Sequence, residues 1–488
     1  MNVAAENISS SPALPNLLKE RQKFNAKLSQ SYPSILGPFF AEYQNIDDQK
    51  IVWSRPPTAD ATIPVVLLHQ IMRDFIDDCK KHQPISEDNM LVLNLTHTMS
   101  RFFPNANDRA VELRDILRDS AIPATTVTLS FKSLSFGRLN FQVDGVIDPS
   151  NHLISVLEVK GEIDSEGVEP YAQAIVNYAH SGWKTSEEHP TFNFPCLIIT
   201  VFGLTSVSSL VYYNVDAMFS GAHISFSGAV WGTRPHFQVL TPSIPLFCHQ
   251  TDTNMREDLA RHLGAFKKAI RSLEQCYKEL RNLALLEDLD PEFPDPRTYH
   301  CLETKAVVKF QYLFQNYEKG LLFHGKTDDD VKICIKFVRR YSQAAHEKCA
   351  TMGIAPKLRG FEDIGAGWTM VIMDDLGEEY KTSDNNDIPV GTREHMRAGL
   401  DELHRAHFVH GDLRGANILV RQGGGKPGFM LVDFDWAGVI GEVRYPANVN
   451  KGGYWRPYGV SDGMLIKPEH DIAMLERIKL QHIPCVFC

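Results

Sequence analysis

The chain lacks any hydrophobic run long enough to span a bilayer. Its longest apolar stretches, such as residues 194–204 of the 488, fall well short of the roughly 20 residues that a membrane-spanning helix needs. The first residues also lack a basic start followed by an apolar core, so no secretory signal is visible. These absences argue against a helical membrane protein and lead us to expect an intracellular protein.

Paired cysteines and strong positive charge are missing as well. Nine cysteines are scattered without paired spacing, which indicates reduced thiols rather than a disulfide framework. The formal net charge of -10 argues against broad electrostatic affinity for phosphate backbones, although a local basic groove is compatible with it. The basic pairs Lys80-Lys81 and Arg339-Arg340 are too short for a nuclear localisation run.

What remains is the composition of an ordinary globular protein, with 43% apolar and 23% charged residues. At 488 residues the chain exceeds the size at which one hydrophobic core keeps growing, so we expect two domains. An acidic stretch with three prolines, residues 288–296, is the best boundary. We therefore predict a weakly patterned segment at residues 1–59, a first domain at residues 60–287 and a second at residues 297–488.

Periodicity predicts a mixed α/β fold for the first domain. Helical spacing between residues 63 and 117 precedes strand-like alternation between residues 126 and 160. A helix at residues 170–180 and an apolar run at residues 196–202 follow. A long amphipathic helix at residues 255–283 then completes the domain.

Three polar residues in the second domain have the spacing of a phosphoryl-transfer site. Asp412 is followed five residues later by Asn417, and Asp433 leaves an apolar strand. Transfer from Mg-ATP needs one carboxylate for the acceptor hydroxyl and oxygen ligands for the metal, and these residues supply both. Without such a role, three polar groups beside apolar strands would incur a desolvation cost for nothing.

A lysine and a glutamate upstream extend this pattern. Lys336 lies in a predicted strand at residues 331–338, and Glu347 lies in a predicted helix eleven residues later. In a nucleotide phosphotransferase, such a lysine contacts the α- and β-phosphates and is held by a helix carboxylate. The order of these parts resembles the protein kinase superfamily over roughly residues 300–475.

The resemblance implies a reduced, two-lobed, α+β protein kinase-like domain that uses ATP and Mg²⁺. It also implies a role for each matching residue: Lys336 and Glu347 anchor ATP, Asp412 is the catalytic base, Asn417 and Asp433 bind Mg²⁺, and Asp471 braces the catalytic loop.

Several departures from the kinase pattern are informative. No glycine-rich loop occurs in the first two strands. Gly411 stands where most protein kinases have the arginine that reads a phosphorylated activation segment, so we expect no such switch. Asp435 stands where those kinases have glycine, and only about fifty residues follow it, too few for a complete C-lobe. The His-Gly-Asp spelling also resembles small-molecule phosphotransferases.

The first domain carries a second set of chemically apt residues. Asp144 and the tripeptide Glu158-Val159-Lys160 fall on neighbouring strands of a predicted hairpin. Alternation places Glu158 and Lys160 on one face, where Asp144 can meet Glu158 across the pair. Two carboxylates with an ammonium beside them predict a Mg²⁺ site with a group that orients or acidifies the attacking water.

A polar helix stripe follows directly, with Gln173, Asn177 and His180 at helical spacing. Together with Asp144 and the Glu-x-Lys tripeptide, it resembles the restriction endonuclease-like PD-(D/E)xK nuclease superfamily. More specifically, the run resembles the nuclease module of fungal Crinkler-type proteins, which is fused to a kinase-like domain. The resemblance implies DNA as substrate, access to the nucleus, and a role for Gln173 in positioning substrate or lysine.

These observations predict a Mg²⁺-dependent nuclease-like domain followed by an ATP-dependent phosphotransferase domain, with protein as the favoured acceptor. Two other interpretations stay open. One is a pair of pseudoenzyme modules that bind partners, nucleotide or DNA without turnover. The other is a small-molecule kinase with a structural first domain. The acceptor, the nucleic-acid preference and the oligomeric state do not follow from the sequence.

Overall fold

A computed structural model describes most of the chain in two compact units, one made by Ser11–Pro296 and the other by Arg297–Cys488. The described residues are 14–30, 44, 50–53, 63–101, 103–118, 129, 131–136, 141–148, 152–162, 170–189, 191–205, 219–247, 251–280, 290–316, 320–383, 391–422, 428–450 and 455–478. Among these residues, no helix is long and apolar enough to cross a membrane.

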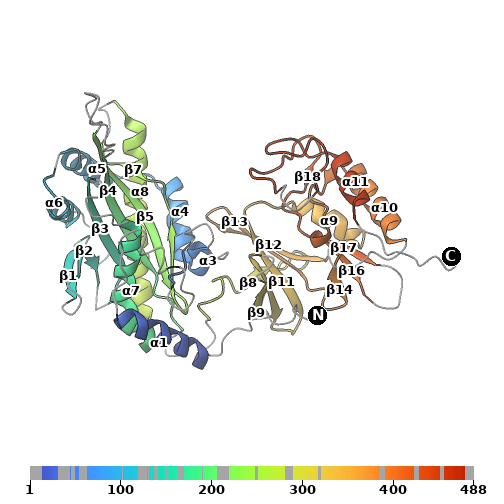
Figure 1. Ribbon diagram of the computed structural model, residues 1–488, viewed down its shortest axis with the longest axis horizontal. Helices are drawn as coiled ribbons and strands as arrows, with labels where there is room; N and C mark the ends of the chain where they lie inside the picture. Colours follow the sequence, from blue (N-terminus) through green and yellow to red (C-terminus); the bar gives the residue numbers. More distant parts are fainter. Residues whose placement is uncertain are drawn as a thin grey trace. The chain divides into compact units, whose positions relative to one another are not determined.

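A mixed sheet forms the centre of the first unit (Figure 1), with strand order β1-β2-β3-β4-β5-β6 and β7 beside β5. All neighbours are antiparallel except β3 and β4, which are parallel. Parallel neighbours need a crossover connection, and α7 (Pro170–Glu188) supplies it. The strands are β1 (Lys132–Phe136), β2 (Phe141–Ile147), β3 (Ser155–Glu162), β4 (Cys196–Thr205), β5 (Phe219–Trp231), β6 (Pro235–Val239) and β7 (Ile244–Pro245).

Helices precede and follow this sheet, so the mixed α/β fold predicted for the first domain is confirmed. The long helix α8 buries an apolar stripe that includes Leu263, Phe266 and Ile270 and packs against α4 and α5. The part of its predicted range after residue 280 lies outside the described residues. The helices are α1 (Leu14–Gln30), α3 (Val65–Leu68), α4 (Gln70–Lys81), α5 (Ser86–Met99), α6 (Ala106–Arg118) and α8 (Thr253–Leu280).

A buried arginine ties α1 to the rest of the first unit. The Arg21 side chain donates hydrogen bonds to five backbone carbonyls, and burial lowers its pKa to about 10. These carbonyls belong to Gly232 (2.7 Å), Ser186 (2.8 Å), Trp231 (2.9 Å), Phe192 (3.0 Å) and His189 (3.2 Å). Residues before position 60, which were expected to be weakly patterned, therefore contribute to this unit.

The second unit begins with an antiparallel sheet of six strands, in the order β12-β13-β11-β10-β9-β8. One helix, α9 (Gln343–Thr351), follows β11. The sheet carries Lys336 on β11, and β13 leads into the segment that begins at Asp374. The strands are β8 (Thr298–His300), β9 (Val307–Asn316), β10 (Leu322–Thr327), β11 (Lys332–Val338), β12 (Leu358–Gly365) and β13 (Trp368–Asp374).

The rest of this unit is a second lobe, in which helices and short strands are joined by irregular segments. Its core joins α10 (Thr392–Arg405) to Phe434 and to Met474 and Leu475 near the end of α11 (Pro468–Glu476). Among the described residues, α11 is the one helix after Asp435. Short strands complete the lobe: β14 (Tyr380–Thr382), β15 (Phe408–Val409), β16 (Ile418–Arg421), β17 (Phe429–Leu431) and β18 (Gly438–Val439).

Candidate active sites

The loop after β15 is fixed by a carboxylate from α11. Asp471 is fully buried and accepts hydrogen bonds from the backbone N–H groups of His410 (2.9 Å) and Gly411 (2.8 Å). Its Oδ2 also bonds His404 Nε2 at 3.0 Å. The bracing role predicted for Asp471 is thus confirmed. Gly411 has φ +84, and a Cβ there would lie 2.9 Å from the side chain of Ile466, so glycine suits this position on both counts.

Asp412 is held on both oxygens. Oδ2 accepts hydrogen bonds from Asn417 Nδ2 at 2.9 Å and from Arg414 Nε at 3.1 Å. Oδ1 lies 2.7 Å from Nη1 of Arg456, whose buried guanidinium packs over the ring of Trp436. Asp412 and Asn417 therefore meet as the sequence predicted, whereas Arg456 lies in an irregular segment and was not anticipated.

Asp433, which follows β17, points to the lysine of the six-stranded sheet. Lys336 Nζ lies 2.9 Å from Asp433 Oδ1 and 2.5 Å from Asp435 Oδ1. Burial alone would lower the pKa of Lys336, but the two carboxylates outweigh it and raise that pKa. Burial raises the pKa of Asp435 to about 7, and the neighbouring Asp433 charge adds to this against the pull of Lys336. Burial opposes ionisation of Asp433 too, but Lys336 lowers its pKa far below the ordinary value.

Glu347 is not brought to Lys336, which corrects the role assigned to it from the sequence. It lies on the exposed face of α9, where it accepts a hydrogen bond from Gln343 at 2.8 Å. The inner face of α9 instead presents His346, whose ring stacks on Phe434 at 4.7 Å. Asp435 supplies the second carboxylate. The sequence signal for the Lys336–Asp435 pair is a carboxylate two residues after Asp433, at the position where most protein kinases have glycine.

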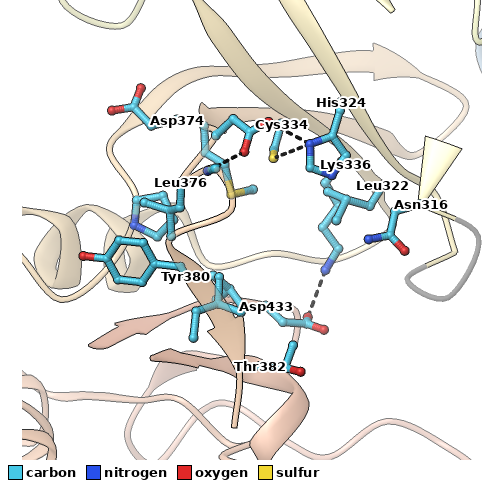
Figure 2. Close-up of a pocket in the computed structure, with 16 residues that line it drawn as sticks. Asn316, Leu322, His324, Cys334, Lys336, Asp374, Leu376, Tyr380, Thr382 and Asp433 are labelled. Carbon is cyan, nitrogen blue, oxygen red and sulfur yellow. Dashed lines mark hydrogen bonds and ion pairs between the residues drawn. The ribbon is translucent and has the colours of Figure 1, made fainter. Parts of the chain in front are cut away.

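A cavity of about 250 Å³ lies beside these groups. Lys336 and Asp433 line one part of it, and Figure 2 shows the lysine extending towards the aspartate. Five apolar residues line another part, and Asp374, Asp375 and Gly377 also line the cavity. An apolar slot next to a lysine and a carboxylate suits a ligand with a flat base at one end and phosphates at the other. The apolar residues are Leu322, Met373, Leu376, Leu419 and Val432.

The first unit brings Asp144, Glu158 and Lys160 together. Gly145 of β2 pairs with Leu157 of β3, so the next residue on each strand, Asp144 and Glu158, also meet. Asp144 accepts a hydrogen bond from the backbone N–H of Val159 at 2.8 Å, and Lys160 Nζ lies 3.3 Å from Glu158 Oε1. The two carboxylates and the ammonium therefore form one cluster, on the strands predicted from the sequence.

In this cluster Glu158 is fully buried and Asp144 is half-buried. Burial raises the pKa of Glu158 well above its ordinary value and the charge of Asp144 adds to it, against opposing contributions from Lys160 and Asn177. Burial likewise raises the pKa of Asp144. Two buried carboxylates that repel each other are stabilised by a cation placed between them. The described cation beside these carboxylates is the ammonium of Lys160, 3.3 Å from Glu158 Oε1.

The helix α7 adds amide groups to the cluster. Asn177 donates a hydrogen bond to Glu158 Oε2 at 2.9 Å, a contact that the sequence left without a role. Gln173 is half-buried on the same helix, and within the described part of the protein its Oε1 has no hydrogen-bond partner. No described hydrogen bond joins Gln173 to Lys160. His180 is buried, which lowers its pKa to about 4 and keeps it neutral.

Comparison with known proteins bears on the second unit, where Lys336 meets Asp433 and Asp412 meets Asn417. Residues 257–440 match the phosphotransferase enzyme family APH. The match covers less than half of the chain and includes Lys336, Asp412, Asn417 and Asp433. It overlaps the first unit only from residue 257 to residue 296, after the mixed sheet. The match supports a kinase-like phosphotransferase domain in the second unit.

One solved structure similar to part of the chain is the kinase PK-1 of the Cydia pomonella granulovirus. The likeness has 17% sequence identity and a TM-score of 0.21, and it covers 25% of this chain and 51% of that kinase. The chain thus spans about half the length of the viral kinase, and so limited a likeness carries no argument. No curated protein matches the chain.

Proposed function

We propose that the second unit transfers the terminal phosphoryl group of Mg-ATP to a hydroxyl group of a protein or small-molecule acceptor. The observation that carries the proposal is the meeting of Lys336 and Asp433 in one cavity, next to a loop that presents Asp412 and Asn417. The order of these parts is that of the kinase template. A binding module without turnover would have no need of all four.

The residues fit a magnesium ion. Asn417 Oδ1 is buried, and within the described part of the protein it has no hydrogen-bond partner, so it is available as a ligand. Asp433 offers carboxylate oxygens, and Mg²⁺ prefers such hard oxygen donors. When bound, Mg²⁺ neutralises the charge of the phosphates.

The protein's own groups then divide the remaining tasks. The ammonium of Lys336 contacts the phosphates, and the apolar part of the cavity holds the base. Asp412 orients the acceptor hydroxyl and takes its proton on a carboxylate oxygen as the oxygen–phosphorus bond forms. The bond between the γ-phosphorus and the bridging oxygen breaks, and ADP leaves with that electron pair. Arg414 and Arg456 keep that carboxylate in a fixed place.

Calorimetric titration of the full-length protein with Mg-ATP tests this assignment. Lys336→Ala and Asp433→Asn should each weaken binding by at least about tenfold, because the first removes the ammonium that faces the phosphates and the second removes a charged ligand of the magnesium ion. Glu347→Gln is the matched control and should bind like the parent, because that side chain faces solvent. Asp412→Asn should bind nearly normally yet lose transfer. Equal affinities for the parent, Lys336→Ala and Asp433→Asn would refute the proposal.

We further propose that the first unit is a PD-(D/E)xK-type nuclease that hydrolyses DNA with Mg²⁺. The support is the buried cluster of Asp144, Glu158 and Lys160 on β2 and β3. Glu158 Oε1 and Gln173 Oε1 are both buried; the former is paired with Lys160 Nζ at 3.3 Å, and the latter has no hydrogen-bond partner among the described residues. Buried carboxylate and amide oxygens of this kind are the ligands that a hard cation such as Mg²⁺ prefers.

In this proposal, Asp144 and Glu158 hold the metal, which supplies charge stabilisation to the scissile phosphate. Lys160 orients the attacking water and helps it to lose a proton, and Asn177 fixes the orientation of Glu158. As the water oxygen bonds to the phosphorus, its proton passes to solvent, and the bond to the leaving oxygen breaks. The combination of this domain with a kinase-like domain is the arrangement of the Crinkler-type proteins that the sequence resembles.

Cleavage of plasmid DNA and of single-stranded RNA by the full-length protein, with Mg²⁺ or Mn²⁺, tests this second proposal. Asp144→Asn and Lys160→Ala should abolish cutting while leaving the melting temperature close to that of the parent. Asp148→Asn is the matched control, because it removes a carboxylate from the end of the same strand outside the cluster. A parent protein that cuts neither nucleic acid, or an Asp144→Asn variant that cuts as well as the parent, would exclude the nuclease.

A further inference from the structure

Three potential metal ligands converge inside the nucleotide cavity and have no task in phosphoryl transfer. His324 on β10 faces Cys334 on β11 in the strand register, and Asp375 follows β13. His324 Nδ1 lies 2.8 Å from Asp375 Oδ2 and 3.7 Å from Cys334 Sγ. The three ligand atoms all lie within 4.8 Å of one another, and all three residues line the cavity. Figure 2 shows the histidine ring turned towards the cysteine sulfur.

These separations suit a tetrahedral cation. With zinc–nitrogen and zinc–oxygen bonds of about 2.1 Å and a zinc–sulfur bond of about 2.3 Å, tetrahedral ligands lie roughly 3.4 to 3.6 Å apart. The sulfur already has this separation from Nδ1, and the oxygen needs to withdraw by about half an ångström. Stacking of the His324 ring on Phe314, at 4.4 Å, holds the imidazole in this orientation.

The donor set selects for a particular class of metal. An imidazole, a thiolate and one carboxylate suit Zn²⁺, whereas Mg²⁺ prefers oxygen ligands alone. The neighbouring Asp374 is already engaged by Arg359, so it does not compete for the same ion. Three protein ligands leave a fourth position, and it opens into the cavity because all three side chains line it.

We propose that His324, Cys334 and Asp375 bind a Zn²⁺-type cation in the nucleotide cavity, and that this cation and the nucleotide exclude each other. The exclusion follows from the shared volume, since Lys336 and Asp433 line the same cavity of about 250 Å³. This second half rests on the proposed phosphotransferase function. If zinc and nucleotide exclude each other, zinc inhibits the phosphotransferase in competition with ATP.

Titration of the reduced full-length protein with Co²⁺ tests the metal site without reference to nucleotide. A thiolate bound to Co²⁺ produces a near-ultraviolet charge-transfer band, which Zn²⁺ should abolish by displacement. Cys334→Ser and His324→Asn should lose the band or weaken Co²⁺ binding by more than about 100-fold, beyond the loss that second-shell changes cause. Cys301→Ser is the matched control and should keep the band, because Cys301 lies beside His300, where an adventitious ion could bind.

Absence of the band from the parent, or its survival in Cys334→Ser, would overturn the site and leave His324 and Asp375 as an ordinary hydrogen-bonded pair. Adding Mg-ATP to the cobalt-loaded parent should weaken Co²⁺ binding at least tenfold. Unchanged or tighter Co²⁺ binding, in protein that calorimetry shows to bind Mg-ATP, would overturn the exclusion. If the band is present but calorimetry detects no Mg-ATP binding, the metal site stands and the phosphotransferase proposal falls.

Discussion

Replacement of Asp471 gives a quantitative test of how the catalytic loop is held. In the parent, this fully buried carboxylate accepts the backbone N–H groups of His410 and Gly411 and bonds His404. Asp471→Ala leaves the two backbone donors buried without an acceptor. Each unsatisfied donor costs about 1–3 kcal/mol, so the lobe should lose about 2–6 kcal/mol of unfolding free energy.

The asparagine variant should fall between the parent and Asp471→Ala. Its single carbonyl oxygen can accept one of the two N–H groups, so Asp471→Asn should cost about 1–3 kcal/mol. Asp401→Ala is the control, since Asp401 forms an exposed pair with Arg397 at 3.2 Å. Such pairs contribute less than about 0.5 kcal/mol.

Hydrogen exchange at increasing urea concentration, followed by mass spectrometry of a peptide covering residues 408–413, measures the opening free energy of this lobe separately from that of the first unit. The expected order of protection is parent and Asp401→Ala, then Asp471→Asn, then Asp471→Ala. If both Asp471 variants lie within about 0.5 kcal/mol of the parent, the loop is not held by this carboxylate and the reasoning is wrong.

Three further outcomes are expected. Burial lowers the pKa of His346 to about 4, so below about pH 6.5 this side chain takes up a proton in the unfolded state but not in the folded state. Urea denaturation should therefore show a free energy of unfolding about 3 kcal/mol lower at pH 4 than at pH 7, and His346→Gln should reduce this difference. Burial raises the pKa of Glu158, so its carboxyl favours the folded state at low pH and disfavours it as pH rises; Glu158→Gln should therefore raise the melting temperature of the first unit at pH 7 while abolishing any nuclease activity. Because Gly411 provides no cationic receptor for a phosphate, phosphatase treatment should leave phosphotransferase activity unchanged, and loss of activity traced to a phosphate within residues 439–455 would contradict this.

The sequence predicted contacts correctly where the two residues are close together along the chain. Asp412 and Asn417 share one loop, and a five-residue spacing fixes their meeting once the loop is recognised. Asp144 and Glu158 belong to a hairpin, where strand alternation alone determines which side chains share a face. In both cases, local geometry leaves little freedom, and the structure places the pairs as predicted.

Contacts between residues far apart in the sequence could not be predicted in the same way. Glu347 was assigned to Lys336 because α9 was predicted, but a short helix with few apolar residues does not reveal which face turns inward. Asp435 and Arg456 reach their partners through the folding of irregular segments, for which periodicity gives no signal. The His324 and Asp375 contact depends on strand order in the sheet, which the sequence alone left undetermined.

The position of Arg21 decides how this protein can be divided for separate study of its activities. A shortened protein that begins at residue 60 would retain every strand of the first sheet and the whole Asp144 cluster. It would also leave five inward-facing carbonyl oxygens around the space of a missing guanidinium, at the ends of α7 and β5. Buried carbonyls without donors are costly, so such a fragment would lose activity through misfolding rather than through chemistry. A fair dissection keeps α1 and separates the chain between Pro296 and Arg297.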